Sequence, residues 1–297
     1  MTKQKQRVKQ IMPWFGGDSQ SAPAIAAAIG DRHTHYVEPF CGGLSVLFAK
    51  PRVKNERVND LHGGLINLAR VVSEPALWEE LNERLAKTVW CDDVHAQCCW
   101  YATSMRASLE TPPQGEGMVD WAWAEFVVAW MGRGGFSGTG TLQGPSRRND
   151  CEGGWSGTRF RSACDSLAWM HERLRTVEIT SIDGIELAGA FSGKSSGDTS
   201  KLAIFCDPPF IEEGDSYYHN FTSDDHDLLA GALNEYRHAR IVVEYHEHDR
   251  LEELYPPKRW RRVPLSTSDQ IGNNKGRKKS SILLINDAAF EGKGTDQ

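Results

Sequence analysis

Short apolar, β-branched runs alternate with helix-period segments along most of this 297-residue chain, and this alternation restricts the fold more than any other feature. We expect strands at 36–38, 57–59, 177–180, 202–206, 240–245, 261–265 and 281–286. We expect helices between most of them, at 22–29, 65–72, 78–85, 162–175 and 224–236. Ser223 or Asp224 is the expected N-cap of the last helix. The pattern predicts an α/β fold: a mainly parallel sheet covered by helices on both faces.

Residues 89–161 break this alternation. They contain two expected helices, 90–109 and 121–131, and then a loop from Gly132 to Arg161 that is dense in Gly, Ser, Arg and Asn. Loops of this length are uncommon in compact domains and usually serve a function. We therefore interpret 89–161 as an insertion in an α/β core formed by 13–88 and 162–287, with 189–199 as a second loop and flexible tails at 1–12 and 288–297.

Composition excludes several classes of protein. With 39% hydrophobic and 25% charged residues the chain is not globally disordered. No run approaches the ~18 apolar residues of a membrane span, and no apolar segment follows the basic N-terminus as in a secretory signal. Seven irregularly spaced cysteines indicate free thiols in a reducing, cytoplasmic compartment. The net charge of -6 argues against a protein that coats nucleic acid, but it permits a local basic cleft.

The segment Phe205-Cys206-Asp207-Pro208-Pro209-Phe210 follows the apolar strand 202–206 directly. In an open α/β sheet, ligands bind beyond the carboxyl ends of the strands. Asp207 and the neighbouring carbonyl groups offer hydrogen-bond acceptors to an amino group there, and Phe210 offers an aromatic face to a planar base. A strand-ending turn is the structural alternative for this motif.

A second motif lies upstream, where the short strand 36–38 leads into Glu38-Pro39-Phe40-Cys41-Gly42-Gly43. The glycines permit close approach of a ligand to the backbone. The motif is not a phosphate loop, because the Lys-Ser/Thr ending is missing. Asp60 follows about twenty residues later at the end of the next strand, an interval that suits an acid binding the two hydroxyls of a ribose.

Together these motifs resemble the DNA adenine methylase family, the Dam-like amino-methyltransferases that use S-adenosylmethionine. Pro13-Trp14-Phe15-Gly16-Gly17 resembles the family's N-terminal Trp-x-Gly-Gly element, and 38–43 its methyl-donor motif. Segments 59–61 and 65–67 resemble the next element. Residues 207–210, followed by Tyr217 or Tyr218, Phe221 and Asp225-His226, resemble the catalytic motif and its trailing helix. The order of the motifs, with an insertion in the middle, is the family's order.

The resemblance implies a Rossmann-like methyltransferase core with a mostly helical target-recognition insertion. It implies that the catalytic residues are Asp207, Pro208, Pro209 and Phe210, which hold the target base. It implies that the residues binding the cofactor S-adenosylmethionine are Trp14, Gly16, Gly17, Glu38, Pro39, Phe40, Cys41, Gly42, Gly43, Asp60 and Asp207.

The sequence departs from the family pattern at three places. The family usually places lysines on both sides of the Trp-x-Gly-Gly core, where this chain has Met12-Pro13 and Asp18. The donor motif usually has a further Gly where Leu44 stands. The catalytic motif more often ends in Tyr than in Phe210, and either ring can stack on a base.

The chemistry follows from the acceptors. The amino nitrogen of adenine is a poor nucleophile because its lone pair is delocalised into the ring. Hydrogen bonds from both amino hydrogens, to the Asp207 carboxylate and the Pro208 carbonyl, would direct that lone pair at the methyl group of the donor. Transfer is expected as a direct in-line displacement, and it requires neither a covalent intermediate nor a metal. In a duplex the target base must first leave the stack.

Basic residues cluster where such an enzyme would meet duplex DNA. One cluster is in the inserted loop and another near the C-terminus, and phosphate contacts from them would make binding salt-sensitive. A solvated surface is the alternative interpretation. The candidate DNA-binding residues are Arg133, Arg147, Arg148, Arg159, Arg161, Lys275, Arg277, Lys278 and Lys279.

Other chemistry-bearing residues have simpler interpretations. Cys91, His95, Cys98 and Cys99 recur at helical spacing, and burial of small thiols is favoured over a zinc site because no second ligand cluster follows. Similarly, 246–249 is interpreted as a polar turn at a strand end. Cys206 is interpreted as a core residue and not a nucleophile, because the sequence places no base beside it.

The sequence therefore predicts a site-specific adenine DNA methyltransferase. Three alternatives stay open: a cytosine amino-methyltransferase, against which Asp207 argues because that kind more often has Ser there; an RNA-directed enzyme; and a non-catalytic DNA-binding module. The expected partner is double-stranded DNA, with no membrane, and the expected state is a monomer or weak dimer. The expected setting is the cytoplasm of a bacterium or a phage-infected cell, and a restriction-modification system with a cognate nuclease is compatible with it.

Overall fold

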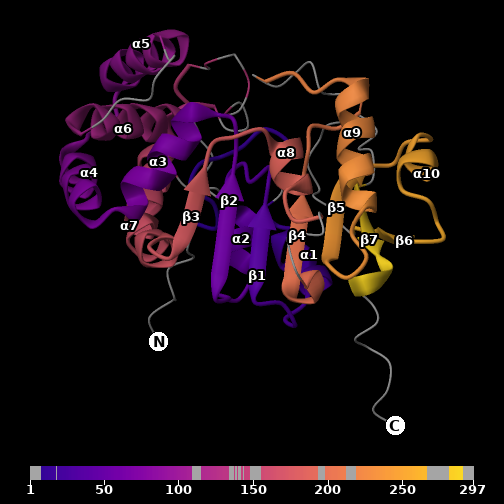
Figure 1. Cartoon of the computed structure of the whole chain (residues 1–297). Helices are drawn as coiled ribbons and strands as arrows, with labels where there is room; N and C mark the ends of the chain where they lie inside the picture. Colours follow the sequence, from indigo (N-terminus) through magenta and orange to yellow (C-terminus); the bar gives the residue numbers. More distant parts are fainter. Residues whose placement is uncertain are drawn as a thin grey trace. The chain divides into compact units, whose positions relative to one another are not determined.

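The computed structural model describes residues 8–17, 19–108, 115–133, 137, 139, 142, 144–147, 155–192, 198–211, 219–265 and 281–289. Within them the strands form a sheet in the order β3-β2-β1-β4-β5-β7-β6 (Figure 1). The strands are β1 (His35–Glu38), β2 (Asn55–Asn59), β3 (Val177–Thr180), β4 (Leu202–Cys206), β5 (Arg240–His246), β6 (Trp260–Pro264) and β7 (Ser281–Asn286).

Helices connect most of these strands, as the alternation predicts. They are α1 (Ala22–Ile29), α2 (Ser45–Ala49), α3 (Gly63–Ser73), α4 (Pro75–Lys87), α5 (Asp92–Ser108), α6 (Glu116–Met131), α7 (Ser156–Leu174), α8 (Gly184–Gly189), α9 (Ser223–Asn234) and α10 (Leu251–Leu254), with 3₁₀ turns at η2 (Thr199–Lys201) and η4 (Asp287–Ala289). None of the helices in the described part of the chain is long and apolar enough to cross a membrane.

Several expected boundaries are corrected. Helix α6 begins at Glu116, five residues before the expected start. Helix α7 begins at Ser156, six residues before the expected start, because Phe160 is fully buried and draws this first stretch into the helix; the expected loop that ends at Arg161 is shorter accordingly. The N-cap of α9 is Thr222, and not Ser223 or Asp224. Thr222 forms a capping box with Asp225, in which each side chain accepts from the other residue's backbone N–H, and this reciprocal pair is more favourable than a single cap.

The sheet is parallel in its centre and antiparallel at one edge. Strand β1 pairs in parallel with both β2 and β4, and β4 pairs in parallel with β5. Strand β7 pairs antiparallel with β5 and β6. The expected mainly parallel α/β sheet is thus confirmed, with a mixed edge. The direction of the strand order reverses between β1 and β4, which is the topological switch point of an open α/β sheet.

The chain divides into two compact units. Unit 1 comprises Met1–Gly17, Gly42–Phe48 and His62–Ser181; unit 2 comprises Asp18–Cys41, Ala49–Leu61 and Ile182–Gln297.

Unit 2 has a core built on period-2 alternation along its strands. Ile204 and Cys206 of β4, together with Ile241 and Val243 of β5, are buried in one cluster with the apolar faces of α8 and α9. Helix α1 packs on β4 and β5 without entering that cluster, so these strands carry helices on both faces. The all-buried pattern of β4, Leu202–Cys206, is the continuous apolar run expected of a central parallel strand.

Unit 1 is mainly helical and centres on α3 and α6, which pack against each other. Helix α6 is mostly apolar and, from Trp121 to Met131, buried except for the partly exposed Trp123. Its one buried carboxylate, Glu125, is matched by Arg106 of α5 through two hydrogen bonds of 2.8 and 2.5 Å. Helices α5 and α6 are the expected helical part of the insertion 89–161, and in the structure they belong to the same compact unit as α3, α4 and α7.

Candidate active site

Two acidic residues of unit 2 lie at the carboxyl ends of neighbouring strands. Glu38 ends β1, and Asp207 comes directly after β4; the strands run in parallel with Val37 opposite Ile204. The switch point lies between these strands, and it is where open α/β sheets bind ligands. The structure therefore brings the two expected motifs, 38–41 and 207–210, to the same edge of the sheet.

Glu38 is held in place by a neighbour on its own strand. The Tyr36 hydroxyl donates to Glu38 Oε2 at 2.8 Å, and both residues are 1% exposed. Burial and the Glu38 charge raise the pKa of Tyr36 well above its ordinary value, so the phenol stays protonated and remains a donor. A carboxylate with a fixed orientation is suited to recognising a polar group of a ligand.

Asn59 fixes the turn that follows β1. Its Nδ2 donates to the carbonyls of Pro39 at 3.0 Å and Ile182 at 2.9 Å, and its Oδ1 accepts from the Ile182 N–H at 2.9 Å. The Cys41 N–H donates to the Asn59 carbonyl at 2.9 Å. Asn59 is fully buried and immediately precedes Asp60. Sequence reasoning quoted Asn59 as part of a motif and missed this bracing role, since its partner Ile182 is distant in the chain.

Phe40 occupies a tight position in this turn. A Cβ on Gly184 would lie 2.5 Å from Phe40 Cε1, so the helix α8 approaches the ring as closely as only glycine allows. On another side the Phe221 ring stands perpendicular to Phe40, with 5.8 Å between ring centroids. The expected donor residue Phe40 is therefore clamped by two segments of unit 2.

Cys206 and Phe210, which flank the Asp207 turn, are both buried. Burial and the charges of Asp207 and Glu38 raise the pKa of Cys206 well above its ordinary value, so its side chain is a neutral thiol and fits the expected core role. The Phe210 ring is 6% exposed and lies against His246 at 4.0 Å and Tyr245 at 6.3 Å between centroids. Asp207 itself is partly exposed.

His246 is the last residue of β5, and the polar residues after it lead through a turn at 249–250 into α10. The Arg250 N–H donates to His248 Nδ1 at 3.1 Å, and the Leu251 N–H donates to the His248 carbonyl at 3.1 Å. These bonds start α10. No group of three or more His, Cys, Asp and Glu side chains in the described residues is arranged to hold a metal ion.

Unit 1 contains the expected donor residues Trp14, Gly42 and Gly43. Gly42 has φ +42°, and a Cβ there would lie 2.8 Å from Cδ1 of the Trp14 indole. A Cβ on Gly43 would lie 2.8 Å from the Met12 carbonyl oxygen. The indole also meets His62 edge-on, at 5.3 Å between centroids. The glycines thus permit a close packing of the Trp14 segment on the 42–44 turn.

Gly16 and Gly17 complete the Trp14 segment. Gly16 has φ +72°, which a glycine adopts at low cost. The Gly17 N–H donates to the Trp14 carbonyl at 3.2 Å, closing the turn. Asp18, where the family usually has a lysine, lies outside the described residues.

Leu44 adopts φ +64°, the left-handed conformation that glycine tolerates best. The resemblance places a further glycine at this position. Leu44 therefore has a backbone conformation typical of glycine, and its side chain is fully buried. The left-handed conformation costs a leucine roughly 1–2 kcal/mol, and burial of the side chain offsets it.

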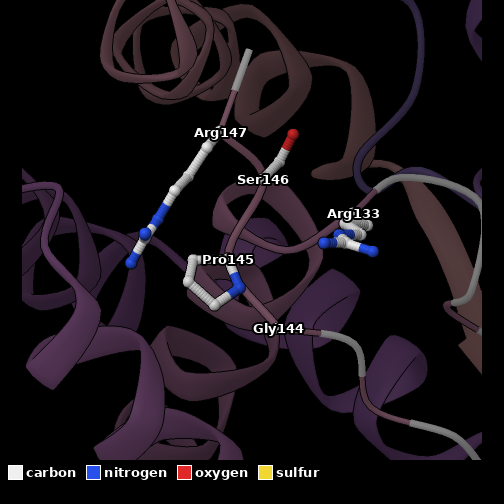
Figure 2. Close-up of a pocket in the computed structure, with 5 residues that line it drawn as sticks. All are labelled: Arg133, Gly144, Pro145, Ser146 and Arg147. Atoms are coloured by element: carbon white, nitrogen blue, oxygen red, sulfur yellow. The ribbon is translucent and has the colours of Figure 1, made fainter.

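Two candidate DNA-binding arginines line a depression of about 480 Å³ in unit 1 (Figure 2). Arg133 and Arg147 lie on either side of the segment Gly144–Ser146 and are both exposed. The base of this loop is closed by backbone bonds, Arg133 N–H to Gly144 O at 3.2 Å and Ser146 N–H to Met131 O at 2.7 Å. The Ser156 hydroxyl donates to the Ser146 carbonyl at 2.6 Å and ties the loop to α7. Arg147 forms an ion pair with Asp92 at the start of α5.

The other candidate arginines have structural contacts or lie outside the described residues. Arg159 has its guanidinium 5.5 Å from the centroid of the Trp130 ring. Arg161 donates to the Leu85 carbonyl at 2.8 Å and to the Thr88 carbonyl, at the end of α4 where carbonyls lack helical partners. Outside the described residues lie Arg148, Lys275, Arg277, Lys278 and Lys279, together with Tyr217 and Tyr218.

The thiol-rich helix α5 behaves as a packing surface. Cys98 is fully buried, and burial raises the pKa of its thiol to about 12. Cys99 Sγ lies 3.7 Å from His95 Nδ1. Burial lowers the pKa of His95, so its ring is neutral near pH 7. Cys98 therefore agrees with the interpretation as a buried thiol, whereas Cys91 and Cys99 are only partly buried.

The fold and the two strand-end motifs define a class: a Rossmann-like α/β methyltransferase. Residues 14–104 match the model of the D12 class of N6 adenine-specific DNA methyltransferases. This match covers less than a third of the chain, and it supports a Dam-like adenine methyltransferase family, whose members are adenine-specific DNA methyltransferases. The match contains Trp14, the 38–43 motif and Asp60, and ends before Asp207. No curated protein matches the chain.

Proposed function

We propose that this enzyme transfers a methyl group from S-adenosylmethionine to the exocyclic amino group of adenine at a specific sequence in double-stranded DNA. The observation that carries the proposal is the arrangement in unit 2, where Glu38 and Asp207 end adjacent parallel strands at the switch point. The family match supplies adenine and DNA as the substrate class. The donor, the site specificity and the role of each residue are the parts proposed here.

The residues present fit an adenosyl donor. The braced turn 39–41 and the carboxylate of Asp60, which follows Asn59 at the end of β2, suit a nucleoside with two ribose hydroxyls. We propose that the same donor is also bound by Trp14, Gly16, Gly17, Gly42 and Gly43. S-adenosylmethionine, when bound, supplies a methyl group on a positively charged sulfur. Glu38 has a fixed orientation, and we propose that its carboxylate binds a polar group of the donor.

Asp207 and Pro208 are assigned to the target base. The Asp207 carboxylate and the Pro208 carbonyl each accept one hydrogen bond from the adenine amino group, which leaves its lone pair directed at the incoming methyl. As the carbon–nitrogen bond forms, the methyl–sulfur bond breaks to leave a neutral thioether, and the amino group then releases one proton. Asp207 is partly exposed. The expectation that Phe210 stacks on the base stays a prediction, and at 6% exposure its ring must be uncovered when the base enters.

The depression between Arg133 and Arg147 is proposed as a contact to the DNA phosphates. The two arginines are exposed and lie on either side of the segment Gly144–Ser146, and their guanidinium groups can bind phosphate oxygens. The loop lies within 89–161, which we propose as the target-recognition region. Arg148, Arg159, Arg161 and the 275–279 cluster remain proposed DNA contacts, and the carbonyl partners of Arg161 give it a second, structural role.

The test of the proposed function is methyl transfer by Asp207→Ala and Asp207→Asn, measured with labelled S-adenosylmethionine and duplex DNA. Both variants should lose at least about a hundredfold in turnover while thermal unfolding changes little, and donor binding by calorimetry tests the second expected role of Asp207, a contact with the donor. The matched control is Asp249→Asn, a carboxylate in the turn after β5 that we give no role in catalysis. Full turnover by the Asp207 variants would refute the assignment.

The product separates the alternatives. Digestion of the methylated DNA to nucleosides should give N6-methyl-2′-deoxyadenosine, whereas N4-methyl-2′-deoxycytidine would favour the cytosine amino-methyltransferase. Preferred turnover on RNA would favour the RNA-directed enzyme. Binding of duplex DNA without binding of S-adenosylmethionine would favour the non-catalytic module. Sequencing of modified bases in DNA from expressing cells gives the flanking sequence and thereby tests the site specificity.

The cellular context is proposed as well. A monomer or weak dimer, a cytoplasmic location and a bacterial or phage origin fit an enzyme that acts on chromosomal or phage DNA. Sedimentation with and without duplex DNA tests the oligomeric state. A nuclease whose cleavage is blocked by the methylation mark would establish a restriction-modification pair.

A further inference from the structure

A continuous series of ring contacts in unit 2 joins the turn after β1 to the turn after β4. Phe40 meets Phe221 at 5.8 Å, and Phe221 meets His226 at 4.7 Å, both nearly perpendicular. His226 meets Tyr245 at 5.6 Å, and Tyr245 meets Phe210 at 6.3 Å. Each distance joins ring centroids and lies within the range of favourable aromatic packing. The end members belong to the proposed donor turn and the proposed base-binding turn.

His226 is the polar member in the middle of this series. It is 1% exposed, and its Nδ1 lies 2.8 Å from the Tyr245 hydroxyl. Its Nε2 is buried and has no hydrogen-bond partner among the residues that the structure describes. Burial, followed by the charge of Arg250, lowers the pKa of His226 to about 4, so the ring is neutral near pH 7.

The Tyr245 hydroxyl makes this contact and also interacts with the hydroxyl of Tyr255, whose ring lies 5.9 Å away between centroids. Tyr245 is fully buried, and burial raises the pKa of its phenol well above the ordinary value. Two neutral groups therefore share one buried hydrogen bond. A leucine at 226 with a phenylalanine at 245 would fill both buried positions without this hydrogen bond, whereas the histidine leaves its Nε2 without a described partner, which costs roughly 1–3 kcal/mol. The histidine is thus an unfavourable choice for packing alone.

We propose that His226 is a positioning residue, which through its bond to Tyr245 and its contact with Phe221 fixes the Phe40 turn relative to the Asp207–Phe210 turn. The inference rests on the proposed function, since it assigns the two turns to the donor and the base. His226 touches neither ligand in this scheme. It holds Tyr245 against Phe210 on one side and Phe221 against Phe40 on the other.

The expected consequence is on the chemical step. In-line transfer requires reacting atoms about 3–3.5 Å apart, and a displacement of about 1 Å can lower the rate about a hundredfold. Loss of the His226–Tyr245 bond lets the two turns move independently while each keeps its own contacts to its ligand. The maximal rate kcat should therefore fall, and KM for donor and for DNA should stay nearly constant.

The experiment compares Tyr245→Phe, His226→Phe and the double variant. Each single variant removes the hydrogen bond and keeps an aromatic ring, and each should lower kcat about ten- to a hundredfold with KM changed less than about threefold. The kcat of the double variant should lie within about threefold of the kcat of the slower single variant, because all three variants lack the same hydrogen bond. A conservative variant, His226→Asn, keeps a polar partner for the Tyr245 hydroxyl and should retain more activity than His226→Phe.

The matched control is Tyr236→Phe. Tyr236 is a buried tyrosine of the same core cluster, whose hydroxyl donates to Ala188 O at 2.8 Å and accepts from Phe191 N–H at 3.1 Å. Its loss should lower the melting temperature as Tyr245→Phe does and leave kcat within about twofold of the wild type. If kcat fell equally in Tyr236→Phe, the fall of kcat in Tyr245→Phe would be explained by general destabilisation. That result would overturn the inference.

Amide hydrogen exchange gives a readout that does not depend on activity. The amides of Phe40 and Cys41 and of Asp207, Phe210 and Ile211 should exchange faster in Tyr245→Phe and His226→Phe than in the wild type, and should be unchanged in Tyr236→Phe. Wild-type kcat in Tyr245→Phe, or unchanged exchange in both turns, overturns the role of His226 and leaves the proposed function intact. A wild-type enzyme that transfers no methyl group overturns the proposed function, and the positioning role with it.

Discussion

The indole of Trp14 lies where a side chain at position 42 would begin: a Cβ on Gly42 would be 2.8 Å from Trp14 Cδ1 and 2.9 Å from Nε1. The backbone of Gly42 is also left-handed, with φ +42°. Gly42→Ala therefore carries two penalties, a strained backbone of about 1–2 kcal/mol and a displaced Trp14 of similar size. We expect a total loss of roughly 3 kcal/mol in the free energy of unfolding, measured by urea titration, together with weakened donor binding by calorimetry.

Gly30→Ala is the matched control for this substitution. Gly30 also has a positive φ, +76°, with ψ −169°, a region that essentially only glycine adopts, but a Cβ there meets no described atom within 4 Å. Gly30→Ala should lose only the backbone part, about 1–3 kcal/mol, with donor affinity unchanged. An unchanged donor affinity in Gly42→Ala as well would show that the contact with Trp14 does not support donor binding.

Leu44 should reverse the usual order of alanine and glycine. At an ordinary position glycine is less stable than alanine by about 0.5–1 kcal/mol. At φ +64° an alanine keeps the strain of the leucine and loses its buried side chain, whereas a glycine loses the side chain and the strain together. Both variants should be less stable than the wild type, and Leu44→Gly should be more stable than Leu44→Ala by up to about 1 kcal/mol. Chemical denaturation measures the difference, and Leu44→Ala as the more stable variant would contradict the assigned strain.

Arg147 shares its charge between Asp92 and the proposed DNA phosphates. Both partners of this ion pair are more than half exposed, so the pair adds little to stability. Arg147→Gln should weaken DNA binding and lower the magnitude of the salt dependence, the slope of log K against log salt, by about 1. Asp92→Asn removes the competing carboxylate and should strengthen binding. Fluorescence anisotropy over a salt series measures both, and an Arg147→Gln slope equal to that of the wild type would exclude Arg147 as a phosphate contact.

His33 should make the protein less stable in acid. Its ring is 4% exposed, and burial together with the charges of Lys50 and Arg240 lowers its pKa to about 4, against the partial opposition of Glu56 and Asp31. A folded pKa below the unfolded value near 6.5 means that stability is complete above pH 6.5 and is lost as the pH falls from 6.5 to 4, because the unfolded chain then binds the proton more readily.

The measurement is the unfolding free energy of the wild type and of His33→Leu between pH 7 and pH 4. The wild type should lose up to about 3 kcal/mol more than the variant over this range. His226, whose pKa is also lowered to about 4, adds the same trend to both proteins, and the comparison therefore isolates His33. Parallel curves for the two proteins would show that His33 is protonated equally in the folded and unfolded chains.

Local sequence patterns determine much of this fold. The apolar run 202–206 is a central parallel strand because its residues are buried on both faces, and the short run 177–180 is a strand as expected. The start of α7 was not predictable from 156–161, since Ser, Gly and Thr are weak helix formers and burial of Phe160 determines the outcome. The N-cap at Thr222 was not predictable either, because Ser223 and Asp224 are equally good N-cap residues. The reciprocal hydrogen bonds with Asp225 select Thr222.

The sequence alone established an α/β enzyme with a glycine-rich turn after one strand and an Asp-Pro-Pro-Phe turn after another, since both signals are local and follow directly from residue type. The tertiary structure decided what holds these turns: the contacts of Asn59 with Ile182, of Phe40 with Gly184 and of His226 with Tyr245. Strand order and side-chain contacts between distant segments depend on how the whole chain packs, and spacing along the chain does not encode them. For the same reason the left-handed Leu44 was visible in the sequence only as a missing glycine, and its backbone conformation is set by the buried site into which its side chain packs.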